Sequence, residues 1–163
     1  MVRNLMAFVL VGIFPLAVFG AQSTSSIWAS LEKDCSVSTP GAHQIKTCSG
    51  PAGFQAIIHQ TPMGEQLTLE NSAHAFSAGV IRCEKGQRIT DLGWRLMNGK
   101  PFAAIVGYQC IGLPGQSRAG ASKRILVQGL KGFEQYGHEV RPAKGGPTRA
   151  GAEALADSWL KAK

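Results

Sequence analysis

Arg95 is the residue whose neighbours in the sequence come closest to a binding site. It lies on a predicted strand, and the predicted partner strand carries Phe102 and Tyr108 on the same face. A guanidinium group among aromatic rings can stack on a ring, pair with a carboxylate or bind a ligand anion. Arg95, Phe102 and Tyr108 are therefore the candidate binding residues. The favoured interpretation of Arg95 itself is a structural arginine whose donors are satisfied within the protein.

Reactive side chains show no spacing that is typical of an enzyme. The histidines lie in four separate segments, and the chain has no Gly-x-Ser-x-Gly, CxxC or HxxxH motif. We therefore assign no catalytic residue, no metal ligand and no cofactor. The alternative is a hydrolase of a cell-wall or anionic substrate, in which Arg95 would hold the anion and His59 or Glu70 would act as acid or base.

The cysteines predict disulfides. Cys35, Cys48, Cys83 and Cys110 all lie beyond residue 20. An even number of cysteines in an exported chain is typical of bridges formed in an oxidising compartment. Three pairings are possible. We favour Cys35–Cys48, which are close in sequence, and Cys83–Cys110, which would join the ends of two predicted strands.

The first twenty residues have the pattern of a secretory signal peptide. A positive charge at Arg3 precedes an almost wholly apolar run over residues 5–19, and Gly20 completes a cleavage site. Residues 21–163 would then form a single globular domain without a transmembrane segment. The sequence therefore predicts an exported protein, periplasmic or secreted.

The chain is basic, with a formal net charge of +7. Loss of Arg3 with the signal peptide lowers this charge by one, to +6. Such a balance attracts acidic proteins and anionic polymers. The basic residues are scattered and accompany no nucleic-acid-binding motif, so nucleic acid is not an expected partner.

The stretch from Leu92 to Cys110 predicts the central hairpin. Two apolar runs flank Asn98-Gly99, a dipeptide that readily forms a type I′ turn. The turn sets the expected pairs Met97–Lys100, Leu96–Pro101, Arg95–Phe102 and Trp94–Ala103. One face would carry Leu92, Trp94, Leu96, Ala103 and Ile105, and the other would carry Arg95, Phe102, Ala104, Val106 and Tyr108. The second strand is apolar on both faces, which indicates a central position in a sheet covered on both sides.

The remaining elements complete an α+β fold with an antiparallel sheet of about five or six strands, stabilised by disulfides. Further strands are expected over residues 54–59, 67–70, 76–83 and 123–130, and loops over 36–47 and 131–147. Ser25 or Ser26 would cap a short N-terminal helix with Ile27, Trp28, Leu31 and Cys35 on one side. Thr148 would cap a C-terminal helix whose apolar stripe packs on the sheet, formed by Ala152, Leu155, Ala156, Trp159 and Leu160.

These features together resemble a family of small, uncharacterised exported bacterial proteins. The similar parts are the signal, an early cysteine followed by Cys48-x-Gly50-x-x-Gly53, the Trp94-Arg95 strand, Lys100-Pro-Phe-Ala-Ala-Ile105 and an Ala-rich helix with Ala156-Asp157. The hairpin segment is the specific part. The resemblance implies an envelope location and brings no activity, ligand or catalytic residue. It also implies a second disulfide nearer the C-terminus, and the positions of Cys83 and Cys110 depart from that pattern.

The functional prediction is a soluble, exported binding or accessory protein of the bacterial envelope, of which an inhibitor-type module is one form. Its motivation is the small size, the disulfides, the basic charge and the lack of a catalytic motif. The expected partner is an envelope protein or an anionic polymer. The hydrolase described above is the alternative.

Overall fold

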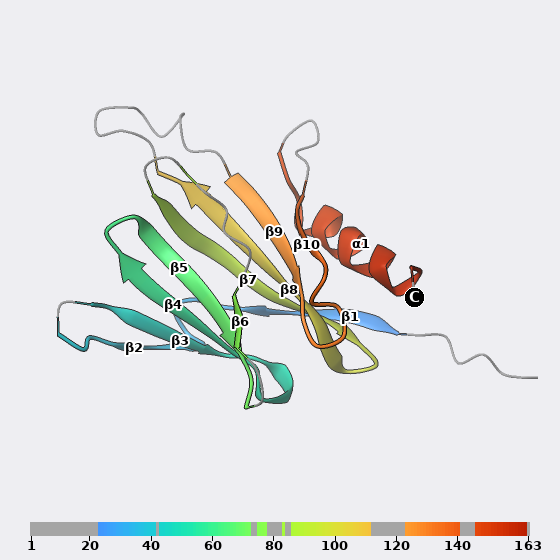
Figure 1. Cartoon of the computed structure of the whole chain (residues 1–163), viewed down its shortest axis with the longest axis horizontal. Coiled ribbons are helices and arrows are strands. Elements are labelled where there is room, and N and C mark those ends of the chain that lie inside the picture. The colour runs from blue at the N-terminus through green and yellow to red at the C-terminus, as the bar shows by residue number, and fades with distance from the viewer. Residues whose placement is uncertain are drawn as a thin grey trace, which may run out of the picture.

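The computed structural model describes residues 23–41, 43–72, 75–77, 83, 86–111, 123–140 and 146–162 (Figure 1). The predicted signal peptide and most of the strand predicted over residues 76–83 lie outside these residues. Within them the chain forms ten strands and one α-helix. The elements are β1 (Thr24–Ala29), β2 (Cys35–Ser38), β3 (Ile45–Ser49), β4 (Gln55–Thr61), β5 (Gly64–Glu70), β6 (Ala75–Ser77), β7 (Gln87–Met97), β8 (Lys100–Cys110), β9 (Lys123–Gly129), β10 (Gly137–Glu139) and α1 (Arg149–Leu160).

Strand β7 is the place where the sheet divides. One edge of β7 pairs along its length with β8. The other edge pairs with β5 only at Gln87 and with β1 from Leu92 to Met97. Two groups of strands therefore meet at β7: one runs in the order β10-β9-β8-β7-β1, and the other, which contains β2 to β6, joins β7 through β5. In Figure 1 the strands β2 to β5 form one layer, and β7 to β9 belong to the other.

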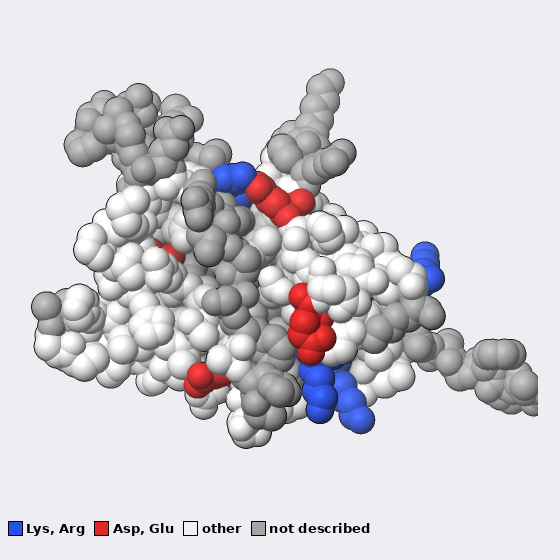
Figure 2. Space-filling view, in the orientation of Figure 1, with Lys and Arg blue, Asp and Glu red and all other residues white. Residues whose placement is uncertain are grey.

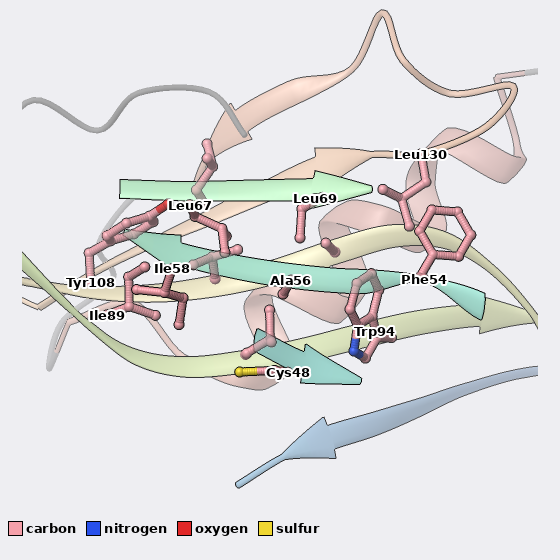
Figure 3. Close-up of a cluster of buried hydrophobic side chains, with 14 of the residues drawn as sticks. Cys48, Phe54, Ala56, Ile58, Leu67, Leu69, Ile89, Trp94, Tyr108 and Leu130 are labelled. Atoms are coloured by element: carbon pink, nitrogen blue, oxygen red, sulfur yellow. The ribbon is translucent and has the colours of Figure 1, made fainter. Parts of the chain in front are cut away.

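A first apolar core fills the space between the two layers (Figure 3). Strands β3 to β5 contribute Cys48, Ala56, Ile58, Leu67 and Leu69, and Phe54 lies just before β4. Strands β7 to β9 contribute Ile89, Leu92, Trp94, Leu96, Ala104, Val106, Tyr108 and Leu126, and Leu130 follows β9. Burial of each large aliphatic or aromatic side chain contributes about 1.5–3 kcal/mol, so this core holds the layers together.

A second core lies on the opposite face of β8 and β9, under α1. Its buried members are Phe102, Ala103, Ile105, Ile125, Val127, Phe133, Val140, Ala152, Ala156 and Trp159. The helix begins as predicted, because the side chain of Thr148 accepts a hydrogen bond from the Gly151 amide at 3.0 Å. The predicted packing of its apolar stripe on the sheet is confirmed. Strand β8 is thus covered on both faces, also as predicted.

The hairpin turn is confirmed, but the predicted faces beyond it are wrong. Asn98 and Gly99 both have positive φ, and Met97 pairs with Lys100 and Leu96 with Pro101. A β-bulge then leaves Phe102 without a partner, so that Arg95 pairs with Ala103 and Trp94 with Ala104. One extra residue exchanges the two faces of a strand. Ala104, Val106 and Tyr108 therefore face Trp94 in the first core, and Phe102, Ala103 and Ile105 lie in the second core with α1.

The predicted N-terminal helix is wrong, as is the predicted loop over residues 36–47. Residues 24–29 form β1, and Cys35–Ser38 and Ile45–Ser49 form β2 and β3. The strand β10 also lies within the predicted loop over residues 131–147. The sheet consequently has ten described strands rather than five or six. Strands predicted over residues 54–59, 67–70 and 123–130 are confirmed as β4, β5 and β9.

Both favoured disulfides are present. Cys35 is bonded to Cys48 across β2 and β3, and Cys83 is bonded to Cys110 at the end of β8. Two such bonds are compatible with an oxidising compartment. In the part of the chain that the structure describes, no helix is both long enough and apolar enough to cross a membrane.

Candidate functional site

The side chain of Arg95 uses four of its five N–H donors in hydrogen bonds within the fold. Its Nε donates to Asp157 Oδ1 at 2.8 Å and its Nη2 to Asp157 Oδ2 at 2.6 Å. Two further N–H donors reach Ser26 Oγ at 3.0 Å and Thr24 Oγ1 at 2.8 Å. The hydrogen bond with Asp157 raises the pKa of Arg95 above its ordinary value. Arg95 therefore has the geometry of the structural arginine that the sequence favoured, and it connects β7 to β1 and α1.

The other two candidate binding residues are not brought together with Arg95. Phe102 is 2% exposed and its ring lies 5.3 Å from that of Phe133 in the second core. Tyr108 is also 2% exposed but lies on the other face of β8, in the first core. Burial raises the pKa of its hydroxyl far above the ordinary value of 10.0. A ligand-binding role for these three residues stays a prediction.

The acid and base that the alternative hydrolase would use lie in the other layer. His59 is on β4, paired with Gln66, and Glu70 is on β5, paired with Gln55. Both are half-buried. The hydrogen bonds of Arg95 go instead to β1 and α1. The geometry thus provides no joint site for Arg95 with His59 or Glu70.

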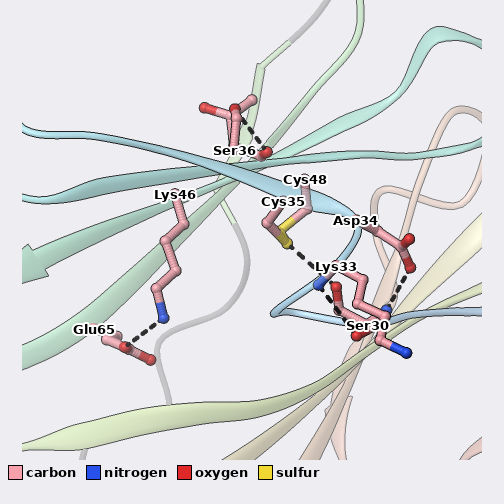
Figure 4. Close-up of a disulfide and its surroundings, with 9 residues drawn as sticks. Ser30, Lys33, Asp34, Cys35, Ser36, Lys46, Cys48 and Glu65 are labelled. Carbon is pink, nitrogen blue, oxygen red and sulfur yellow. Dashed lines mark hydrogen bonds and ion pairs between the residues drawn. A yellow bond between two sulfur atoms is a disulfide. The ribbon is translucent and has the colours of Figure 1, made fainter.

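A cleft opens where the sheet divides. Between Gln87, which pairs with β5, and Leu92, which pairs with β1, the open edge of β7 has no neighbouring strand among the described residues. The carboxylate of Glu65 takes the place of a strand there, because its Oε2 accepts the Ile89 amide at 2.6 Å. Figure 4 shows that Lys46 reaches towards Glu65 beside the Cys35–Cys48 bond, with an Nζ–Oε1 distance of 3.9 Å.

The cleft has a volume of about 390 Å³ and is lined largely by polar side chains. Three cationic residues line it, and they come from three elements: Lys46 from β3, Arg88 from β7 and Arg149 from α1. Asp91 and Glu32 are the acidic residues of the lining. On the face shown in Figure 2 the described acidic and basic side chains stand in small separate groups.

Asp91 fixes the position of one of these cations. Its Oδ1 accepts from Arg149 at 2.5 Å, and its Oδ2 lies 3.2 Å from Lys123 Nζ. Burial raises the pKa of Asp91, but the hydrogen bonds from Arg149, Lys123 and Thr90 together lower it by more than burial raises it. The net pKa therefore lies below 3.8. Asp91 is therefore ionised at neutral pH and holds Arg149 at the cleft.

Trp28 provides a second support for Arg149. The guanidinium lies 4.2 Å from the centre of the Trp28 ring, which is a cation–π distance. The indole in turn lies on Gly93 of β7, where an added Cβ would approach the ring carbon Cε3 to 2.7 Å. Only glycine leaves room for this stack, so Gly93, Trp28 and Arg149 are positioned together.

Sequence reasoning missed this cleft. Arg88 and Arg149 were recognisable only as members of a scattered basic set, and Lys46 lies in a segment that the sequence predicted to be a loop. Their joint position depends on the division of the sheet at β7, which no spacing along the chain indicates. Among the described residues, no group of three His, Cys, Asp or Glu side chains is arranged to hold a metal ion.

Comparison with known proteins does not extend this description. The chain matches no protein-family model, no curated protein and no solved structure. The resemblance to small exported bacterial proteins therefore stays a prediction from the residues quoted for it.

Proposed function

We propose that the chain is an exported binding protein of the bacterial envelope that recognises an anionic group in the cleft beside β7. The observation that carries the proposal is the convergence of Lys46, Arg88 and Arg149 from three elements on one opening. The signal-like start and the two disulfides support export. The basic charge of the chain would favour the approach of an acidic partner.

The cations of the cleft are available to a ligand to different degrees. Arg88 is exposed and makes no ion pair within the described part of the chain. Lys46 has only a long contact with Glu65. Arg149 is 55% exposed although one of its nitrogens contacts Asp91. A carboxylate or phosphate group between Arg88 and Arg149 would gain charge-assisted hydrogen bonds from both.

The carboxylates near the cleft support binding better than hydrolysis. Glu65 already accepts the Ile89 amide, and Asp91 is held in its ionised form by two cations. A general acid needs a proton at working pH, and a general base needs a lone pair that faces the substrate. Asp91 carries no proton for a general acid, and both of its oxygens contact cations, so we place a binding role before the hydrolase.

Binding assays on oxidised mature chain test this proposal with two probes, poly-glutamate and polyphosphate. Loss of Arg88 in R88A should weaken binding by about tenfold, because one charge-assisted contact contributes about 1.5–3 kcal/mol. The matched control is K131A, since Lys131 is an exposed cation in the turn after β9. Equal losses in both variants would show unspecific charge attraction, and no binding by the wild type would contradict the proposal. Turnover of peptidoglycan by the wild type would replace the binding proposal with the hydrolase.

A further inference from the structure

Strand β1 has a free edge that lacks the usual protection. It pairs with β7 on one side, and on the other side no described strand is its neighbour. Its sequence, Thr-Ser-Ser-Ile-Trp-Ala, contains no charge and no proline. The edge strand at the opposite end of this layer, β10, carries Glu139 paired with Arg124. Natural proteins protect free edges with such charges, so the unguarded edge of β1 is suited to pairing with another strand.

An apolar groove accompanies this edge. It has a volume of about 390 Å³ and runs between Ile27–Ala29 of β1 and Ser49–Pro51 at the end of β3, with Trp94 and the single charged residue Asp34 also in its lining. Ile27 is 48% exposed there. Ile27 is the partner of Trp94 across the β1–β7 pair, so both side chains lie on the face of β1 that the groove borders.

Trp94 adds an independent observation. Its side chain is fully buried, and its Nε1 has no hydrogen-bond partner among the described residues. Figure 3 shows this nitrogen on the end of the ring turned away from Phe54. The edge of the ring beside Nε1 contacts Gly50, where an added Cβ would lie 2.6 Å from Cε2. A buried donor without an acceptor is uncommon, and Trp94, which carries it, belongs to the lining of the groove.

We propose that an extended segment of an acidic partner protein adds to β1 as a further strand and places an apolar side chain in the groove against Ile27. The alternating amide and carbonyl groups of a free strand edge are matched by another polypeptide backbone, which a polysaccharide or a lipid does not supply. The strong positive charge of the chain disfavours a second copy as the occupant and favours an acidic partner. This interaction is centred on the free edge of β1 and shares only Arg149 among the cations of the cleft, so it goes beyond the proposed function.

The alternation of β1 defines what such a strand would contact. Ser25, Ile27 and Ala29 share one face of β1, and the last two of them line the groove. Thr24 and Ser26 face α1, because their hydroxyls accept hydrogen bonds from Arg95. Apolar side chains of the added strand would therefore face the groove, and its acidic side chains would lie on the side where Arg149 covers Trp28.

A synthetic peptide that alternates valine and glutamate is the probe. Binding to ¹⁵N-labelled mature chain should shift the amide signals of β1 and the indole N–H signal of Trp94. Two analogues of the peptide are N-methylated, one at all valines and the other at all glutamates. Because alternate amides of a strand point to opposite edges, each analogue has one edge blocked, so one of them should lose affinity and the other should retain it. Unchanged affinity of both analogues would overturn backbone pairing.

Matched variants locate the interaction. I27K places a charge on the free edge and should weaken peptide binding by about tenfold or more. The control is V37K, because Val37 is an exposed apolar residue on β2 in the other layer; it should bind like the wild type, and both variants are first shown to fold by circular dichroism. R88A should also bind the peptide normally.

Loss of peptide binding in R88A but not in I27K would place the peptide in the cleft, which supports the proposed function and overturns this inference. Light scattering gives a further check. If the wild type is a dimer and I27K is a monomer, the edge of β1 pairs with a second copy of the chain, and the inference of an acidic partner is overturned too.

Discussion

Arg95 donates hydrogen bonds to residues of two other elements. Two go to Asp157 of α1, and one each to Thr24 and Ser26 of β1. The side chain of Arg95 is 11% exposed and that of Asp157 is 31% exposed. The pair is thus partly desolvated, and its contacts attach the N-terminal strand and the C-terminal helix to the same central strand. We infer that its main effect is on stability.

Replacement of Arg95 tests this role. R95A should lower the free energy of unfolding by about 2–3 kcal/mol, because it removes a charge-assisted pair and leaves Asp157 without its partner. R95K keeps the charge but loses the planar fork, so it should recover only part of the loss. Urea denaturation of the three proteins measures the difference. A change below about 0.5 kcal/mol in R95A would mean that the pair contributes no more than an exposed salt bridge does.

At the scale of elements, α1 depends on Thr148. The hydroxyl of Thr148 satisfies the Gly151 amide, one of the first-turn donors that have no partner inside the helix. T148A should destabilise the protein by about 1 kcal/mol, and T148S should have little effect because serine caps equally well. Thermal unfolding followed by circular dichroism compares the variants. A loss of equal size in T148S would contradict capping and indicate that the threonine methyl group packs.

Strand β2 depends on its disulfide. It is short, forms one end of the sheet, and three of its four residues are exposed. Cys35 and Cys48 face each other across β2 and β3, 13 residues apart in sequence. Their joint replacement by serine should cost about 3 kcal/mol through the unfolded state and speed amide exchange in β2. Hydrogen exchange measured by mass spectrometry checks this, with the β8 and β9 amides as internal reference. Unchanged exchange in β2 would show that backbone pairing alone holds the strand.

Some elements could be predicted from the sequence because their signals are local. The hairpin turn depends only on Asn98 and Gly99, which both tolerate a positive φ. The start of α1 depends only on Thr148 and the first helical turn that it caps. Strand β1 could not be predicted so. Ile27, Trp28 and Leu31 satisfy a helical spacing. The hydroxyls of Thr24 and Ser26 nevertheless both reach Arg95, which requires the two-residue period of a strand. The contact that decides between helix and strand is made with Arg95, about 70 positions away along the chain. A tertiary interaction therefore overrides the local preference here.

The whole molecule is organised by the division of the sheet at β7. This division places the first core between the two layers, opposite the core under α1, and it leaves the gap that becomes the cleft. Neither the bulge at Phe102 nor the gap has a signature in the sequence: the bulge shifts the register of β7 and β8 close to their turn, and the gap arises because β5 and β1, which are distant in sequence, share the other edge of β7. For this reason the candidate residues Phe102 and Tyr108 separate into two cores, and the cleft is formed by cations that were not singled out.

Asp91 connects these parts of the molecule, and acid should break the connection. It lies on β7 and contacts Lys123 of β9 and Arg149 of α1. Its pKa in the folded state is below the ordinary 3.8, so its contribution to stability is present above that value and is lost as the pH falls through the lowered folded pKa. D91N lacks this contribution at any pH. We therefore expect D91N to be less stable than the wild type at pH 7, with a difference that shrinks once the pH is well below 3.8.

Urea denaturation at pH 7 and near pH 2.5 measures this difference. E32Q is the matched control, because Glu32 is an exposed cleft residue that makes no ion pair in the described part of the chain. E32Q should follow the wild type at both pH values. A constant difference between D91N and the wild type would mean that the stabilisation comes from packing around residue 91 and not from its charge. A difference that vanishes in acid would show that an ionised Asp91 joins β7, β9 and α1, and that Arg149 loses one of its two supports at the cleft when that charge is removed.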